Sequence, residues 1–187
     1  MLAAVDRNEA FGLDQTMLAL AGLVVCASLV QAPQEIGLRN VSVSEWWRWF
    51  RLACLFACCL LGIGVILIPV ALVLGQPIFP MRYPFSLNGL IFMCVYAPVT
   101  EEVTYRLLLT LACRPTLGTG GTILASGLLF AGVHINGGNP GLDNMVAGFL
   151  LEWVFLRSRS ILVPIAMHAG GNALAFSVHV ASWHLWH

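Results

Sequence analysis

The sequence contains no lysine, and charged residues occupy only 10% of its 187 positions. Hydrophobic residues occupy 59%, and the mean hydropathy is +0.85. A soluble domain of this length requires a charged surface, which nine arginines and nine acidic residues cannot provide. Because the formal net charge is zero, the chain also lacks the cationic excess that neutralises phosphates, so we expect no nucleic-acid partner. The composition indicates an integral membrane protein.

Several other signals are missing. The sequence has no CxxC pair, no low-complexity tract and no internal repeat. Its six cysteines are Cys26, Cys54, Cys58, Cys59, Cys94 and Cys113. All lie in or beside apolar runs, where cysteine is usually a small buried hydrophobe, so we expect neither disulfides nor metal ligands among them. The first residues carry charges of both signs and no cleavable apolar run, which predicts a polar extension rather than a signal peptide.

The apolar runs are long enough to cross a bilayer, whose hydrocarbon core of roughly 30 Å requires about 20 helical residues. Six such segments are present, at residues 16–32, 52–75, 87–113, 116–135, 142–156 and 161–183. The first and the fifth are short, which leaves open that they lie partly in the membrane interface. We therefore predict an all-α, polytopic transmembrane helix bundle of about six spans. Two spans fall in residues 1–85 and four in residues 86–187, within one continuous membrane domain.

The distribution of arginine predicts the orientation. The loops after the first, third and fifth segments carry Arg39, Arg48, Arg51, Arg114, Arg157 and Arg159, and the opposite side carries Arg7 and Arg82. By the positive-inside rule, the three arginine-rich loops lie in the cytoplasm and both termini lie outside it, as expected for a bacterial inner-membrane protein. Trp46, Trp47 and Trp49 beside these arginines are typical of an interfacial anchor, although packing in a core explains them equally well.

A few polar residues remain inside the apolar segments: Glu101, Glu102, Arg106, His134, Glu152, His168 and Asn172. An ionisable side chain at the middle of a membrane costs about 2.5–3.5 kcal/mol on insertion scales, so each one requires a partner or a function. Intramembrane residues of this kind commonly mark a functional site.

The first cluster follows a proline. Pro98 is unfavourable inside a helix but suits a first helical turn, so we expect a break there, with Glu101 and Glu102 in the first turn of a new segment. Glu102 and Arg106 are four residues apart and can form an ion pair on one helix face. Glu101 lies about 100° around the helix from Glu102, which leaves it without a local cation and free for chemistry.

Two further motifs contain histidine. Phe130-Ala-Gly-Val-His134 closes the fourth segment, and His168-Ala-Gly-Gly-Asn172 lies in the sixth. His168 and Asn172 are one turn apart and project from the same face. Taken alone, each motif is also explained by hydrogen bonding and close packing between helices.

Together, these residues resemble the CPBP family of CAAX proteases and bacteriocin-processing enzymes, also called Abi proteins. The family motifs EExxxR, FxxxH and HxxxN stand here, in order, as Glu101–Arg106, Phe130–His134 and His168–Asn172. The resemblance covers roughly residues 98–175, and the run from Ala97 to Glu102 is similar to the Ras-converting CAAX endopeptidase branch. Leu107 departs from the glycine that many bacterial members have after the arginine.

The resemblance implies an intramembrane endopeptidase that cleaves a membrane-anchored or prenylated protein tail. It implies that Glu101 and His134 activate a water as general base, and that His168 and Asn172 bind the developing oxyanion. Glu102 and Arg106 would then support the helix that presents Glu101.

Members of the family are also described as metalloproteases, and Glu101, His134 and His168 are residue types that bind zinc. The sequence has no HExxH motif, and one carboxylate would have to serve as either ligand or base, so we favour a mechanism without metal or other cofactor. Zinc stays an open alternative.

The predicted segments place the site residues at different depths in the membrane. His134 lies near the outer end of its helix and Glu101 nearer the inner end, so the sequence alone does not bring these two residues together.

Two alternative functions stay open. One is a proton-coupled transporter that uses the same buried residues, and the other is a non-catalytic membrane scaffold or immunity factor. The absence of an inverted repeat in the sequence speaks against the transporter.

Overall fold

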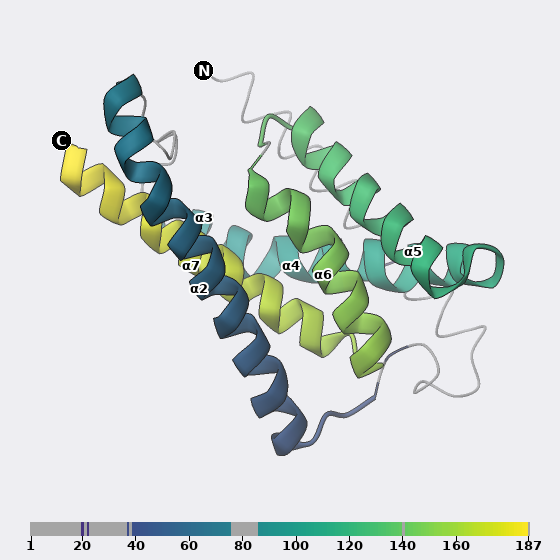
Figure 1. Cartoon of the computed structure of the whole chain (residues 1–187). Helices are drawn as coiled ribbons and strands as arrows, with labels where there is room; N and C mark the ends of the chain where they lie inside the picture. Colours follow the sequence, from purple (N-terminus) through teal and green to yellow (C-terminus); the bar gives the residue numbers. More distant parts are fainter. Residues whose placement is uncertain are drawn as a thin grey trace.

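The computed structural model describes residues 39–75, 86–139 and 141–186, together with Leu20, Gly22 and Gly37. The helical elements are α2 (Val43–Leu74), α3 (Leu87–Ile91), η1 (Phe92–Tyr96), α4 (Ala97–Glu102), η2 (Val103–Leu108), α5 (Leu109–Asn136), α6 (Leu142–Ser158) and α7 (Leu162–Trp186) (Figure 1). Among the described residues no strand forms, so the predicted all-α class is confirmed.

Within the described residues, two helical runs are long and apolar enough to cross a membrane, Val43–Leu67 and Leu87–Asn136. The exposed side chains of α2 are apolar over several turns, with Ile66 74% exposed and Val73 86% exposed. A surface of this kind is suited to lipid rather than water. The number of spans stays a prediction, because the first predicted segment, residues 16–32, lies outside the described residues apart from Leu20 and Gly22.

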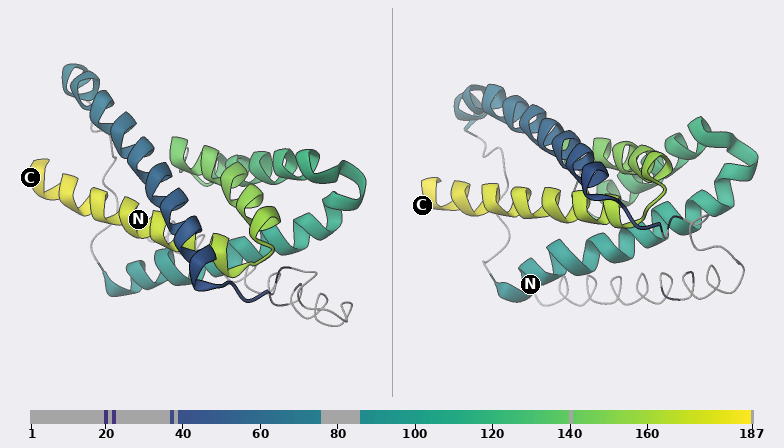
Figure 2. Two further views of the ribbon diagram at one scale, coloured as in Figure 1. Left: turned by 60° about the horizontal axis from the view of Figure 1, so that its bottom comes forward. Right: turned by 90° about the horizontal axis from the view of Figure 1, so that it is seen from below.

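The run Leu87–Asn136 folds back on itself and forms a helical hairpin (Figure 2). The turn is at Gly118, whose backbone has φ 65° and ψ −175°. Glycine adopts this conformation without the steric penalty that a Cβ would add. The predicted third and fourth segments are therefore the two arms of one hairpin, which reverses later in the chain than the predicted loop at residues 114–115.

The expected helix break at Pro98 is absent, which corrects the sequence-based prediction. The backbone stays right-handed helical from Tyr96 through Val103, and the hydrogen-bond pattern changes instead. Two π-helical segments, η1 and η2, flank the short helix α4. A π-turn accommodates the missing N–H of proline because it already departs from the i→i−4 pattern. Glu101 and Glu102 consequently end α4 and do not face a free helix N-terminus.

The second arm of α5 packs closely along α6 (Figure 1). A Cβ added to Gly148 would lie 2.9 Å from Phe130 Cβ and 3.1 Å from Gly127 Cα, so both glycines are required for this approach. Helix α7 then passes beside α2, η1, α4 and α6. This arrangement brings the three polar motifs, which are far apart in sequence, toward the middle of the bundle.

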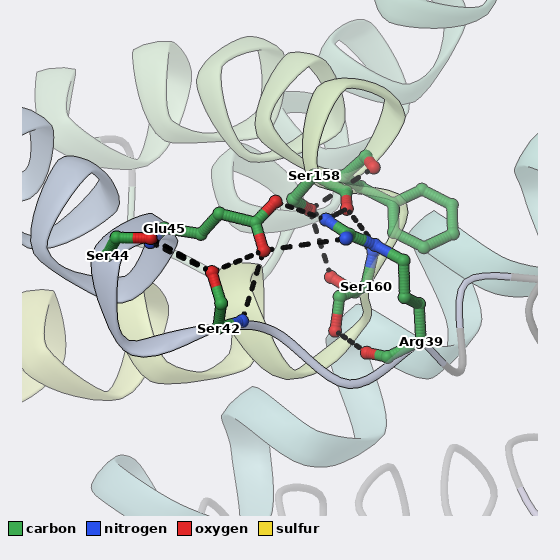
Figure 3. Close-up of polar contacts among 7 residues, drawn as sticks. Arg39, Ser42, Ser44, Glu45, Ser158 and Ser160 are labelled. Carbon is green, nitrogen blue, oxygen red and sulfur yellow. Dashed lines mark hydrogen bonds and ion pairs between the residues drawn. The ribbon is translucent and has the colours of Figure 1, made fainter.

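The chain before α2 is attached to the turn between α6 and α7 (Figure 3). Arg39 donates to Glu45 Oε1 at 2.7 Å and to the Ser158 carbonyl at 2.8 Å, and Ser160 Oγ donates to the Arg39 carbonyl at 2.8 Å. Ser42 and Glu45 form a capping box, because Ser42 N–H donates to Glu45 Oε2 at 3.0 Å and Glu45 N–H to Ser42 Oγ at 3.4 Å. These contacts fix the start of α2 relative to α7.

Candidate active site

Glu101 lies between two imidazole rings. Its Oε2 is 4.0 Å from His134 Nε2 and 3.9 Å from His168 Nε2. The three side chains are only 16%, 17% and 8% exposed. Glu101 Oε2 is a buried atom without a hydrogen-bond partner among the described residues. Three residues from three separate motifs, on α4, α5 and α7, therefore meet around one carboxylate oxygen.

The hairpin explains how Glu101 and His134 reach the same level. Glu101 lies 17 positions before Gly118 and His134 lies 16 positions after it. At about 1.5 Å of rise per residue, both are about 25 Å from the turn. The mismatch in depth between these residues disappears once the reversal is placed at Gly118.

The other nitrogen of each ring is held by a hydrogen bond. His134 Nδ1 lies 2.9 Å from the Phe130 carbonyl, and His168 Nδ1 lies 2.8 Å from Glu102 Oε1. Carbonyl and carboxylate oxygens accept hydrogen bonds, so each Nδ1 carries the proton. Both Nε2 atoms are then directed at Glu101 with their orientation fixed.

Glu102 and Arg106 form the ion pair that their spacing predicts. Arg106 Nε lies 2.9 Å from Glu102 Oε2, and both side chains are fully buried. The other Glu102 oxygen accepts the hydrogen bond from His168, a contact between residues 66 positions apart that the sequence analysis did not predict. Glu102 thus joins the EExxxR motif to the HxxxN motif and fixes the ring of His168.

Phe130 packs at the centre of these side chains and is itself fully buried. Its ring stacks on His134 with centroids 4.3 Å apart and meets His168 edge to face at 5.9 Å. The Arg106 guanidinium lies 5.2 Å from the centroid of the same ring. The phenylalanine of FxxxH therefore holds both imidazoles in place and partly covers the guanidinium.

Asn172 contacts the backbone of η1. Its Nδ2 donates to the Met93 carbonyl in η1 at 2.7 Å. Ala97 N–H bonds the Phe92 carbonyl in the i→i−5 pattern, and the next residue, Pro98, has no N–H to offer to Met93. The Asn172 amide supplies the missing donor, so it stabilises the π-helical segment before Glu101.

A further buried carboxylate, that of Glu152, lies outside the Glu101 cluster. Glu152 is fully buried and accepts a hydrogen bond from Thr110 Oγ1 at 2.6 Å, while Arg106 Nη1 donates to Ser126 Oγ at 2.7 Å. The sequence analysis identified Glu152 as an intramembrane acid but assigned it neither a partner nor a role. Thr110 could have been identified as a candidate only from the α5–α6 contact, which no local spacing reveals.

The distances between the Glu101 carboxylate and the two imidazole nitrogens bear on whether Glu101, His134 and His168 could bind a metal. Zinc with ligand distances of about 2.0–2.1 Å in tetrahedral geometry places its donors about 3.3 Å apart. The separations of 4.0 and 3.9 Å are wider, and within the described ranges no group of three His, Cys, Asp or Glu side chains has ligand geometry. The donor atoms of this arrangement therefore lie farther apart than zinc ligands do, whereas the hydrogen-bonded Nδ1 of each ring is also typical of a histidine that binds zinc. A water with hydrogen bonds of about 2.8 Å spans such separations.

Comparison with known proteins gives one family. Residues 82–174, about half of the chain, match the family model described as type II CAAX prenyl endopeptidase Rce1-like. The match contains every motif residue from Glu101 to Asn172. The search of curated proteins and the search of solved structures each gave no significant match. With its three motifs meeting in one buried cluster and this family match, the chain belongs to the Rce1-like CAAX protease family.

Proposed function

We propose that this protein is an intramembrane endopeptidase that hydrolyses a peptide bond in a membrane-anchored or prenylated protein tail. The main observation in its support is the position of Glu101 Oε2, which lies 4.0 Å from His134 Nε2 and 3.9 Å from His168 Nε2. No described residue forms a hydrogen bond with this oxygen. Such an oxygen is placed to take a proton from a water that hydrogen-bonds to it and to an imidazole. The family supports a membrane-associated protein as the substrate class.

In the proposed reaction, Glu101 removes a proton from water as the water oxygen attacks the scissile carbonyl. His134 orients that water through Nε2, because its Nδ1 proton is committed to the Phe130 carbonyl. When the tetrahedral intermediate collapses, Glu101 returns the proton to the leaving amine and the peptide C–N bond breaks. Proton transfer by a positioned side chain contributes typically 10²–10⁴-fold to a rate.

In the proposal, His168 and Asn172 stabilise the oxyanion. His168 donates through Nε2 when it is an imidazolium, and its Nδ1 bond to Glu102 stabilises that positive charge. Asn172 has two amide protons, of which one is used by the Met93 carbonyl. Removal of one such donor typically costs about 3 kcal/mol of transition-state stabilisation. The burial of the cluster strengthens these interactions by excluding water.

Direct peptide cleavage tests this proposal against the transporter and scaffold alternatives. Purified protein in detergent is incubated with a prenylated CAAX peptide, and the released C-terminal tripeptide is measured by mass spectrometry. The proposal expects release from the prenylated peptide or from a membrane-anchored tail, and none from either substrate with Glu101→Gln. No described contact favours the transporter, and absence of hydrolysis with either substrate by folded protein would contradict the protease.

A further inference from the structure

A concave surface lies at the N-terminal end of α2, away from the Glu101 cluster. It is an open depression of about 980 Å³ between the first turns of α2 and the C-terminal end of α6. Three arginines and three tryptophans make up most of its lining: Arg48, Arg51, Arg157, Trp47, Trp49 and Trp153. The helices that contribute these residues approach each other at the lower part of Figure 1. We refer to this surface as the arginine–tryptophan pocket.

No acidic side chain in the described part of the chain balances the positive charge of the pocket. The lining contains no Asp or Glu, and within the described part of the chain none of its three arginines forms an ion pair. The nearby carboxylate of Glu45 is already paired with Arg39 at 2.7 Å. Three guanidinium groups on one concave surface favour an anion, and their planar donors suit phosphate oxygens.

The aromatic side chains point to the same ligand chemistry. Arg48 lies 4.6 Å from the centroid of Trp49, and Trp49 packs edge to face on Trp153 with centroids 6.1 Å apart. Trp49 is only 3% exposed, and its buried indole Nε1 has no hydrogen-bond partner among the described residues. The Arg48 guanidinium is thus stacked on an indole that is itself held by packing against α6, which limits the positions that this cation can take.

The position of the pocket relative to the apolar helix identifies the rest of the ligand. Leu52 and Leu55 continue the lining into the apolar run of α2, and Leu55 is 62% exposed. A ligand that fills the whole surface therefore has an anionic head near the arginines and an acyl chain along α2. We propose that the arginine–tryptophan pocket binds the headgroup of an anionic phospholipid. This side is the one that the arginine distribution predicts to be cytoplasmic, where anionic lipids attract basic side chains.

Tryptophan quenching by brominated lipid measures this binding directly. Three of the six tryptophans line the pocket, so brominated phosphatidylglycerol bound there quenches their fluorescence. The protein is reconstituted in phosphatidylcholine vesicles and titrated with brominated phosphatidylglycerol or brominated phosphatidylcholine. We expect saturable quenching at a several-fold lower mole fraction for phosphatidylglycerol. Equal quenching by the two lipids would overturn the proposal.

Substitutions test the residues that bind the headgroup. The triple variant Arg48→Gln/Arg51→Gln/Arg157→Gln should lose the preference for phosphatidylglycerol, and the single variant Arg157→Gln should weaken it if the triple variant does not fold. Arg114→Gln is the matched control, because Arg114 is exposed on α5 and does not line the pocket. An unchanged preference in folded triple or single variant would refute the assignment. Competition by millimolar inorganic phosphate to the same extent as by lipid would instead identify a soluble-anion site and also overturn the lipid proposal.

Discussion

The Asn172 side chain donates a hydrogen bond of 2.7 Å to the Met93 carbonyl. Pro98, which follows the i→i−5 bond of Ala97, cannot donate to this carbonyl because it has no N–H. The HxxxN motif on α7 thereby stabilises the π-helical turn before Glu101. A substitution at Asn172 consequently affects two properties, the stability of this turn and any donation to an oxyanion. These two effects are separable by experiment.

A double-mutant cycle between Asn172 and Pro98 separates them. Asn172→Ala should destabilise the protein by about 1–3 kcal/mol because it leaves the partly buried Met93 carbonyl without a donor. In a Pro98→Ala background, residue 98 regains an N–H, so the same change should cost less. Thermal unfolding in detergent measures both. Strictly additive effects would show that the proline and the asparagine do not share the carbonyl.

The activity of the same variants tests the oxyanion role. If the second Asn172 proton stabilises the oxyanion, the Asn172→Ala/Pro98→Ala variant should recover stability without recovering peptide cleavage. Recovery of the wild-type cleavage rate would limit Asn172 to a structural role.

Glu102→Gln should lower both folded yield and activity. The substitution leaves the buried Arg106 charge unpaired, and breaking a buried ion pair costs about 3–5 kcal/mol. It also weakens the acceptor that orients His168. The measurements are the amount of folded protein after membrane extraction and the cleavage rate per folded molecule. Normal yield and normal rate together would contradict the role of Glu102.

Glu152 should affect stability more than chemistry. Thr110→Val removes the donor to the buried Glu152 carboxylate and should cost about 1–3 kcal/mol in thermal unfolding. Glu152→Gln retains an acceptor for Thr110, so this variant should keep most of the stability and the cleavage rate. A rate that falls by orders of magnitude in stably folded Glu152→Gln would place this residue in the reaction itself.

The sequence predicted the local relations of the site better than its long-range ones. The Glu102–Arg106 pair follows from a four-residue spacing and is confirmed. The meeting of Glu101 and His134 depends on where the hairpin reverses, and hydropathy placed that loop at residues 114–115 rather than at Gly118. The Glu102–His168 and Asn172–Met93 contacts arise from helix packing and from π-helical hydrogen bonding, which periodicity does not encode.

Cysteine labelling tests the orientation. Arg39 contacts the Ser158 carbonyl, so the chain near residue 39 and the α6–α7 turn lie on the same side of the membrane. Cysteines introduced at Asn40 and Arg157 should both react with an impermeant reagent, and only from the cytoplasm. A reporter fused after His187 should be outside the cytoplasm if six segments cross. Labelling of the two cysteines from opposite sides would contradict the fold, and a cytoplasmic reporter would mean that one segment does not cross.

Metal removal separates the two hydrolytic mechanisms. With a water activated by Glu101 and His134, stringently demetallated protein should retain its cleavage rate, and added zinc should not increase it. The rate should also show a bell-shaped pH profile, because Glu101 must be ionised to act as the base and His168 must be protonated to donate to the oxyanion. One tightly held zinc per active chain, with activity lost on chelation and restored by stoichiometric metal, would contradict this mechanism.

The central claim is that Glu101 is the base that activates water, and the most direct test is the single-turnover cleavage rate of Glu101→Gln. The substitution keeps the size of the side chain and removes its basicity, while the ion pair of Glu102 and Arg106 stays intact. The account predicts a rate at least about 10²-fold below wild type at normal folded yield, from loss of general-base catalysis. A Glu101→Gln enzyme that cleaves the same tail at the wild-type rate would contradict it.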